Sequence, residues 1–250
     1  MSTTPRTLIF DIETIPLDFE TSFDDAQKHY LLHNARSDQE AEYIKTSGSL
    51  NPLMGQVACI GTLVHETQSG AALFLAPEAS EEVVETPEMT IRYKAFTDER
   101  ALLEHFWEKL PKGYQTVVTF NGRNFDCPFL MLRSAVLGIR PSLNLMGGTR
   151  YEHKVTEVGE NKWGGAAHVD LQEKLIFGAG FDRFGATRKF NLDFYTKAFG
   201  IPSPKSATIS GDKVPAFYRE GRMREVAEYC MRDVRATSQL YAKWDEFLRF

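Results

Sequence analysis

The stretch TLIFDIET, residues 7–14, constrains the fold most, because a run typical of a buried strand ends in two carboxylates. Residues two apart on a strand point to the same side, so Asp11 and Glu13 share a face, roughly 7 Å apart, with Ile12 on the other. Two such carboxylates repel each other and are costly to bury, and a divalent cation with oxygen ligands would remove that cost. The alternative is that the chain has already reached water at Asp11.

Strand and helix patterns alternate along the rest of the chain. Asp98 is a typical N-cap, and Gly138 closes the following helix, which has Pro128 in its first turn. A polar segment at 17–50 has only weak helical periodicity, and we interpret it as an insertion or helical flap. The predicted strands are 7–14, 56–66, 72–76, 115–122 and 167–171, and the predicted helices are 98–110, 125–138, 190–200 and 222–248.

Two further segments are predicted to be irregular. The acidic, proline-bounded residues 77–88 indicate a loop, and the glycine-rich residues 147–165 indicate a loop or hairpin. No internal repeat or low-complexity linker interrupts the chain. The pattern therefore predicts one α/β domain over residues 1–250, with a central mixed sheet.

Composition narrows the class of protein. The net charge is −5 and the pI is about 5.7, which argues against coating of duplex nucleic acid but permits a small site where cations supply positive charge. The three cysteines lie far apart, which indicates free thiols in a reducing compartment. Without a signal-peptide pattern or a long apolar run, the expected location is the cytoplasm.

Two other motifs carry acidic residues. Asp126 follows a strand, a turn and an aromatic residue at the start of a helix. There it either belongs to a functional site or only interacts favourably with the helix dipole. Tyr229 and Asp233 are four residues apart, so they share a face of the last helix. That spacing is common by chance, but both residues lie on the core-facing stripe, where a buried aspartate needs a partner.

Taken in order, FDIET, TFNGRNFDCPFL and YCMRD resemble the three motifs of the DEDD superfamily of 3′–5′ exonucleases. The tyrosine four residues before the last aspartate matches the DEDDy branch, whereas the histidine branch would need His at 228, where Glu stands. The middle motif is most similar to the proofreading domain of family B DNA polymerases. The chain thus resembles a stand-alone version of that domain, although 17–50 and 77–95 match no part of it.

The resemblance implies an RNase H-like fold, a central mixed sheet flanked by helices. It also implies hydrolysis of phosphodiester bonds at a 3′ end, with release of nucleoside monophosphates. The family's metal ligands fall on Asp11, Glu13, Asp126 and Asp233, which would hold two Mg²⁺ or Mn²⁺ ions. By resemblance, Asp11 bridges both ions, Glu13 and Asp233 hold the ion that binds the attacking water, and Asp126 holds the other. Tyr229 would orient or help to deprotonate the water.

Three residues are candidates for substrate binding, each with a structural alternative. Thr14 would meet the terminal nucleotide, or is a strand-end hydroxyl. Asn121 matches a family asparagine near the substrate strand, or is a turn residue. Phe125 would pack on a terminal base, or is a core aromatic. Asp170 resembles a family position close to the site, or caps the segment that follows it.

Other functions remain open at this point. Single-stranded DNA is the favoured partner, with proofreading or DNA repair as the setting, and an exoribonuclease of the same superfamily is the alternative. A haloacid-dehalogenase-like phosphatase also opens with an apolar strand and two acids, but its pattern needs Asp where Glu13 stands. A non-catalytic nucleic-acid-binding module is the third possibility, and the complete set of acidic residues argues against it.

Overall fold

A central mixed sheet organises the computed structural model, which describes residues 6–110, 114–147, 154–157, 166–177, 187–204 and 209–249. In this part of the chain nine strands hydrogen-bond in the order β4-β5-β3-β2-β1-β6-β9-β8-β7. Their bounds are β1 Thr7–Pro16, β2 Gly55–Val64, β3 Ser69–Leu75, β4 Ser80–Glu85, β5 Thr90–Phe96, β6 Thr116–Thr119, β7 Leu143–Asn144, β8 Lys154–Glu157 and β9 Ala166–Asp170.

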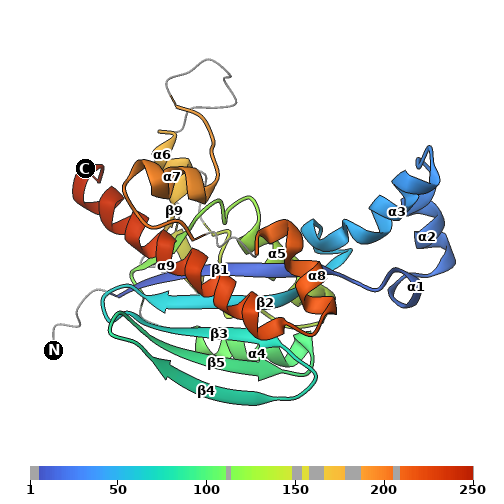
Figure 1. The fold of residues 1–250 in the computed structure, drawn as a ribbon, viewed down its shortest axis with the longest axis horizontal. Helices are drawn as coiled ribbons and strands as arrows, with labels where there is room; N and C mark the ends of the chain where they lie inside the picture. The colour runs from blue at the N-terminus through green and yellow to red at the C-terminus, as the bar shows by residue number, and fades with distance from the viewer. Residues whose placement is uncertain are drawn as a thin grey trace.

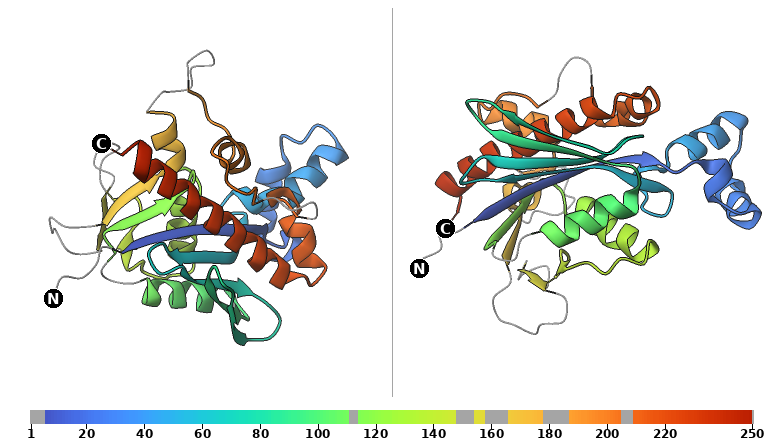
Figure 2. Two further views of the ribbon diagram at one scale, coloured as in Figure 1. Left: turned by 60° about the vertical axis from the view of Figure 1, so that its left-hand side comes forward. Right: turned by 90° about the horizontal axis from the view of Figure 1, so that it is seen from below.

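Helices cover both faces of the sheet (Figures 1 and 2). One face packs against α9, and the other packs against α4 and α5. The helix bounds are α1 Phe19–Ser22, α2 Asp25–Leu32, α3 Asp38–Thr46, α4 Glu99–Lys109, α5 Asp126–Val136, α6 Leu171–Leu175, α7 Leu192–Ala198, α8 Val214–Arg219 and α9 Met223–Phe247, with 3-10 turns η1 Gly48–Leu50 and η2 Gly211–Lys213.

Strand β1 lies at the centre because its side chains are apolar on both faces. Leu8, Phe10 and Ile12 enter the core under α4 and α5, while Ile9 and Ile15 enter the core under α9. β1 pairs antiparallel with β2 and parallel with β6, and β6 pairs parallel with β9. This arrangement confirms the predicted mixed sheet flanked by helices, in an α/β, RNase H-like fold.

Local signals in the sequence also agree with the structure. The Asp98 side chain accepts from Ala101 N and caps α4, and α5 ends before Gly138, whose φ is +68°. The predicted helix at 222–248 is α9. The predicted strands at 56–66, 72–76, 115–122 and 167–171 correspond to β2, β3, β6 and β9. Most of the predicted loop or hairpin at 147–165 lies outside the described residues, apart from β8.

The prediction of a loop at 77–88 is wrong, because β4 forms there and pairs antiparallel with β5. The Glu81 carboxylate contacts both Arg92 and Lys94 on β5, so its charge is met across the strands. β4 is the edge of the sheet and is largely exposed, where acidic side chains are solvated and discourage pairing with another molecule.

The segment at 17–50 contains α1 to α3 and η1 and projects from the body of the molecule (Figure 1). Neither α2 nor α3 buries a residue, which explains their weak apolar periodicity. The base of the segment is nevertheless fixed, since Thr14 Oγ1 donates to Ser49 O at 2.6 Å and Leu17 N donates to Met54 O at 2.8 Å. Among the helices that the structure describes, none is both long and apolar enough to cross a lipid bilayer.

Candidate active site

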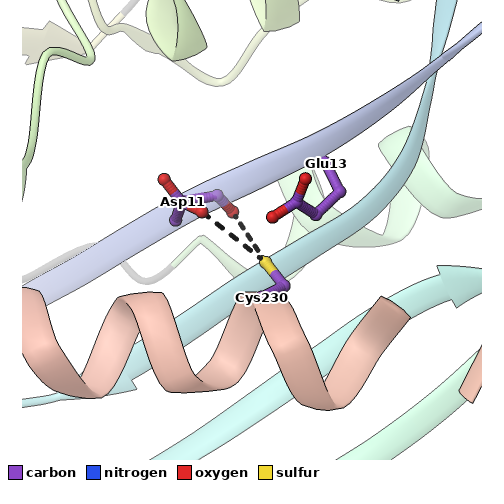
Figure 3. Close-up of side chains that lie close together, drawn as sticks. All are labelled: Asp11, Glu13 and Cys230. Atoms are coloured by element: carbon purple, nitrogen blue, oxygen red, sulfur yellow. Dashed lines mark hydrogen bonds between the residues drawn. The ribbon is translucent and has the colours of Figure 1, made fainter. Parts of the chain in front are cut away.

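On the face of β1 that packs against α9, two carboxylates lie among side chains that are otherwise apolar. The side chains on this face run Ile9, Asp11, Glu13, and Glu13 is only 8 % exposed. Figure 3 shows Asp11 and Glu13 lying over Cys230 of α9. The Cys230 Sγ is 3.6 Å from Asp11 O and 4.0 Å from Asp11 Oδ2. One ligand atom from each of these three residues lies within 4.8 Å of the others, a spacing that can hold a metal ion.

A glycine on β2 allows α9 to lie this close to the sheet. A Cβ at Gly61 would come within 2.8 Å of Cys230 Sγ and 2.9 Å of Val234 Cγ2. Gly61 pairs directly with Asp11 in the register of β1 and β2. The missing side chain therefore lets the helix approach the strand beside the carboxylates.

Asp126 reaches the same place from α5. Pairing between β1 and β6 covers only Thr7 to Ile9 of β1, so the next amide groups on that edge need other acceptors. The Asp126 Oδ1 atom accepts a hydrogen bond from Ile12 N at 3.0 Å. Asp126 is the first residue of α5 and is 3 % exposed. Its carboxylate is thus fixed to the backbone between Asp11 and Glu13.

Tyr229 and Asp233 enter the group from α9. A hydrogen bond joins their side chains, and the nearby charges of Asp233 and Glu13 act on Tyr229. Burial and then these charges raise the pKa of Tyr229 above its usual value, so the hydroxyl keeps its proton at neutral pH and donates to Asp233. This protonation state suits a positioning role and not that of a general base.

Burial and crowding oppose ionisation of the carboxyl groups. Burial is the main reason that the pKa values of Asp11 and Glu13 are well above their usual range, followed by repulsion from Asp126 for Asp11 and from Asp233 for Glu13. Burial also raises the pKa of Asp126 to about 7, against the opposing effect of the backbone hydrogen bonds it accepts. A divalent cation would reverse this repulsion, and oxygen-rich, anionic donor sets suit hard cations. The residues therefore fit a metal centre.

Metal binding should accordingly depend on pH. Because the pKa of Asp126 is about 7, its carboxyl is largely protonated at about pH 6, and an entering cation must displace that proton. We expect Mn²⁺ affinity, measured by calorimetry, to rise as the pH increases from about 6 to about 8, with proton uptake by the buffer at the lower pH. In Asp126→Asn the pH dependence should be smaller. Equal affinities at both pH values in the unaltered protein would contradict this assignment.

The three candidate substrate-binding residues have structural partners. The Thr14 hydroxyl donates to Ser49 O, so its proton is not available to a nucleotide. Asn121 has φ +65°, and its Oδ1 accepts from Asn124 Nδ2. Phe125 packs on Phe129 with ring centroids 5.5 Å apart. Their roles in binding substrate stay predictions.

Two further residues near the site are Asp170, for which the sequence left two alternatives open, and Cys230, which was not predicted as a site residue. Asp170 accepts from Asn121 N, Arg123 N and Gln172 N, so it caps α6 and organises the turn before Asp126. This is the capping alternative considered from the sequence. Cys230 lies between Asp11 and Glu13, and only its place directly after Tyr229 in the third motif pointed to it.

Comparisons with known proteins show the family to which the chain belongs. Residues 65–248 match the family described as "Predicted 3'-5' exonuclease related to the exonuclease domain of PolB". This range includes Asp126, Tyr229 and Asp233, whereas Asp11 and Glu13 precede it.

Relatives and a solved structure are also similar to this chain, and the solved structure covers nearly all of it. A DNA polymerase of Thermococcus litoralis is 27% identical over 150 residues, 58% of this chain and 8% of that protein. One of Pyrococcus horikoshii is 26% identical over 196 residues, 72% of this chain and 15% of that protein. The family B DNA polymerase of Pyrobaculum calidifontis superposes with TM-score 0.58 and 21% identity over 98% of this chain and 25% of that one. The chain thus spans a small part of these polymerases, and it belongs to the family of predicted 3′–5′ exonucleases related to the exonuclease domain of PolB.

Proposed function

We propose that this protein trims single-stranded DNA from its 3′ end in a reaction that depends on two Mg²⁺ or Mn²⁺ ions and releases nucleoside monophosphates. The observation that carries the proposal is the meeting of acidic side chains from β1, α5 and α9, which are more than 100 residues apart in sequence. We further propose that residues 1–250 act as one exonuclease domain, with 17–50 as an insertion or flap.

The donor set supports the choice of metal. Asp11, Glu13, Asp126 and Asp233 would hold the cations through oxygen atoms, as Mg²⁺ and Mn²⁺ prefer. Two such cations activate a water molecule and stabilise the charge on the attacking and leaving oxygens. The Cys230 thiol lies beside Asp11, with Sγ 3.6 Å from the Asp11 backbone oxygen, to which its S–H can donate weakly.

The protein's own groups would then orient the reaction. Water attacks the phosphorus of the terminal phosphodiester, the bond to the 3′-oxygen of the preceding nucleotide breaks, and that oxygen takes up a proton. Tyr229 keeps its hydroxyl proton and, held by Asp233, orients the attacking water. The bond from Ile12 N to Asp126 limits movement of that carboxylate during the reaction.

The proposed substrate follows from two considerations. The relatives with matching sequences are DNA polymerases, which favours DNA over RNA. A terminal phosphate must reach a group of half-buried and buried carboxylates, which a stacked base pair would obstruct. Single-stranded ends are therefore the expected substrate.

A digestion experiment tests the proposal. DNA and RNA oligomers with a 5′ label, single- and double-stranded, are incubated with Mg²⁺ or with Mn²⁺. We expect a ladder of shortened single-stranded DNA and nucleoside monophosphates as products. Asp233→Asn should reduce the rate by about 10³-fold, since a lost metal ligand removes several kcal/mol of transition-state stabilisation.

The matched control is Asp245→Asn, the same change on the same helix at an exposed aspartate that pairs with Arg249. Its rate should equal that of the unaltered protein. If RNA oligomers are shortened and DNA oligomers are not, the activity is that of an exoribonuclease and the proposed DNA substrate is wrong. No shortening of any oligomer with either metal would refute it.

A further inference from the structure

Arg232 differs from the other cations of α9 in its partners. Arg224, Arg235 and Lys243 each form an ion pair with at least one glutamate. Arg232 instead donates from Nε to Pro204 O at 3.3 Å, and it forms no ion pair with a carboxylate in the part of the chain that the structure describes. Its charge is thus held in place by a neutral carbonyl.

The guanidinium of Arg232 lies beside the candidate active site. Its Cζ atom is 5.6 Å from the centroid of the Tyr229 ring, and Tyr229 bonds to Asp233. Arg232 is half-buried on α9, and its side chain reaches the backbone of Pro204, which follows α7 in the chain. A positive charge therefore lies beside Tyr229, which itself bonds to Asp233.

A guanidinium in this place has a clear chemical use. Nε is occupied, and among the described residues neither Nη group has a hydrogen-bond partner, so both can donate with the fork geometry that matches two phosphate oxygens. The contacts with Pro204 and Tyr229 restrict the side chain in advance, which lowers the entropy lost when it binds a ligand. The acidic site around it repels a polyanion, so a nearby cation favours the approach of a substrate strand.

We propose that Arg232 binds a phosphate of the substrate strand next to its 3′ end, through both Nη groups. This inference rests on the proposed function, since it assumes that a nucleic-acid strand enters the site. It assigns the strand a path along α9, past Tyr229 and toward Pro204.

Salt dependence of binding tests the contact without needing hydrolysis. A 5′-fluorescent oligothymidylate is titrated with protein in Ca²⁺ at several salt concentrations, its anisotropy is recorded, and its length is checked afterwards. For Arg232→Gln we expect about tenfold weaker binding and a slope of log affinity against log salt that is smaller by about 0.7, the value for one lost phosphate contact on a single strand. Arg232→Lys should keep the slope and bind with intermediate affinity.

Arg235→Gln is the matched control, because it removes the same charge from the same helix at an arginine paired with Glu88. Its slope should equal that of the unaltered protein. If both glutamine variants lower the slope equally, or if Arg232→Gln leaves it unchanged, the proposal is overturned. If the unaltered protein binds the oligothymidylate but does not trim it, the proposed function is refuted, whereas the contact between Arg232 and a phosphate can still be tested. No binding at all would overturn both.

Discussion

Replacing Asp11 by asparagine should abolish trimming of 3′ ends and, at the same time, make the metal-free protein more resistant to unfolding. Asparagine keeps the shape of the side chain but removes a metal ligand, so we expect at least about a 10³-fold loss of rate. It also removes a buried carboxyl whose pKa is held well above its usual value by burial and by Asp126 and Glu13. Relief of that cost should increase the free energy of unfolding of the metal-free protein.

The pH dependence gives the sign of this second effect. A carboxyl with a raised pKa in the folded state costs nothing while protonated, and its cost grows as the pH rises above its unfolded value of about 4. The gain in melting temperature from Asp11→Asn should therefore be larger at about pH 8 than at about pH 5. Saturating Mn²⁺ should reverse the order of the two proteins, since only the unaltered one binds it fully.

Asp18→Asn is the control, because Asp18 caps α1 at the surface and asparagine caps helices equally well. Neither its rate nor its melting temperature should change. If Asp11→Asn instead lowers the melting temperature of the metal-free protein at neutral pH, the repulsion among these carboxylates has been overstated.

The second large effect concerns stability alone. Arg133 and Glu99 form a buried ion pair, and their side chains are only 5% and 6% exposed, respectively. Glu99 Oε1 also accepts from Val57 N, and Arg133 Nη1 donates to Pro52 O. Arg133→Met should lower the free energy of unfolding, measured in urea, by about 3–5 kcal/mol, because it leaves a buried carboxylate without its partner.

Two further variants separate the charge effect from lost packing. Adding Glu99→Gln to Arg133→Met should recover more than half of the loss, since the neutral amide oxygen still accepts from Val57 N. Arg100→Met, the same substitution in the exposed pair with Glu104, should change stability by less than about 1 kcal/mol. A loss in Arg133→Met no larger than in Arg100→Met would show that the buried charge is compensated in some other way.

Much of the fold was predictable because the local sequence patterns favour the same secondary structure as the tertiary packing does. The apolar run of β1, the Asp98 cap and the apolar stripe of α9 each have one dominant interpretation, and the structure confirms all three. Strand β4 was missed because its glutamates disfavour a strand locally. The arginine and lysine that meet Glu81 lie 11 and 13 residues further along the chain, and only pairing with β5 brings them together.

The candidate site was predictable as a set of residue types in order, and its arrangement was not. The spacing of Tyr229 and Asp233 predicts a shared helix face, and their hydrogen bond follows from it. No sequence pattern gives the bond from Ile12 N to Asp126, because it depends on where pairing between β1 and β6 stops. The position of Arg232 depends on the Pro204 carbonyl, which comes from a separate segment.

Because Gly61 has no side chain, the distance between α9 and strand β2 depends on which residue stands at this position. One added methyl group at this position would press on Cys230 and Val234, and the helix would have to move outward by a few tenths of an ångström or more. Tyr229 and Asp233 would move with it, while Asp11 and Glu13 would stay on their strand. In the proposed two-cation site, ion selectivity, which depends on how tightly oxygen atoms can close around a cation, would thus depend on a residue that carries no functional group.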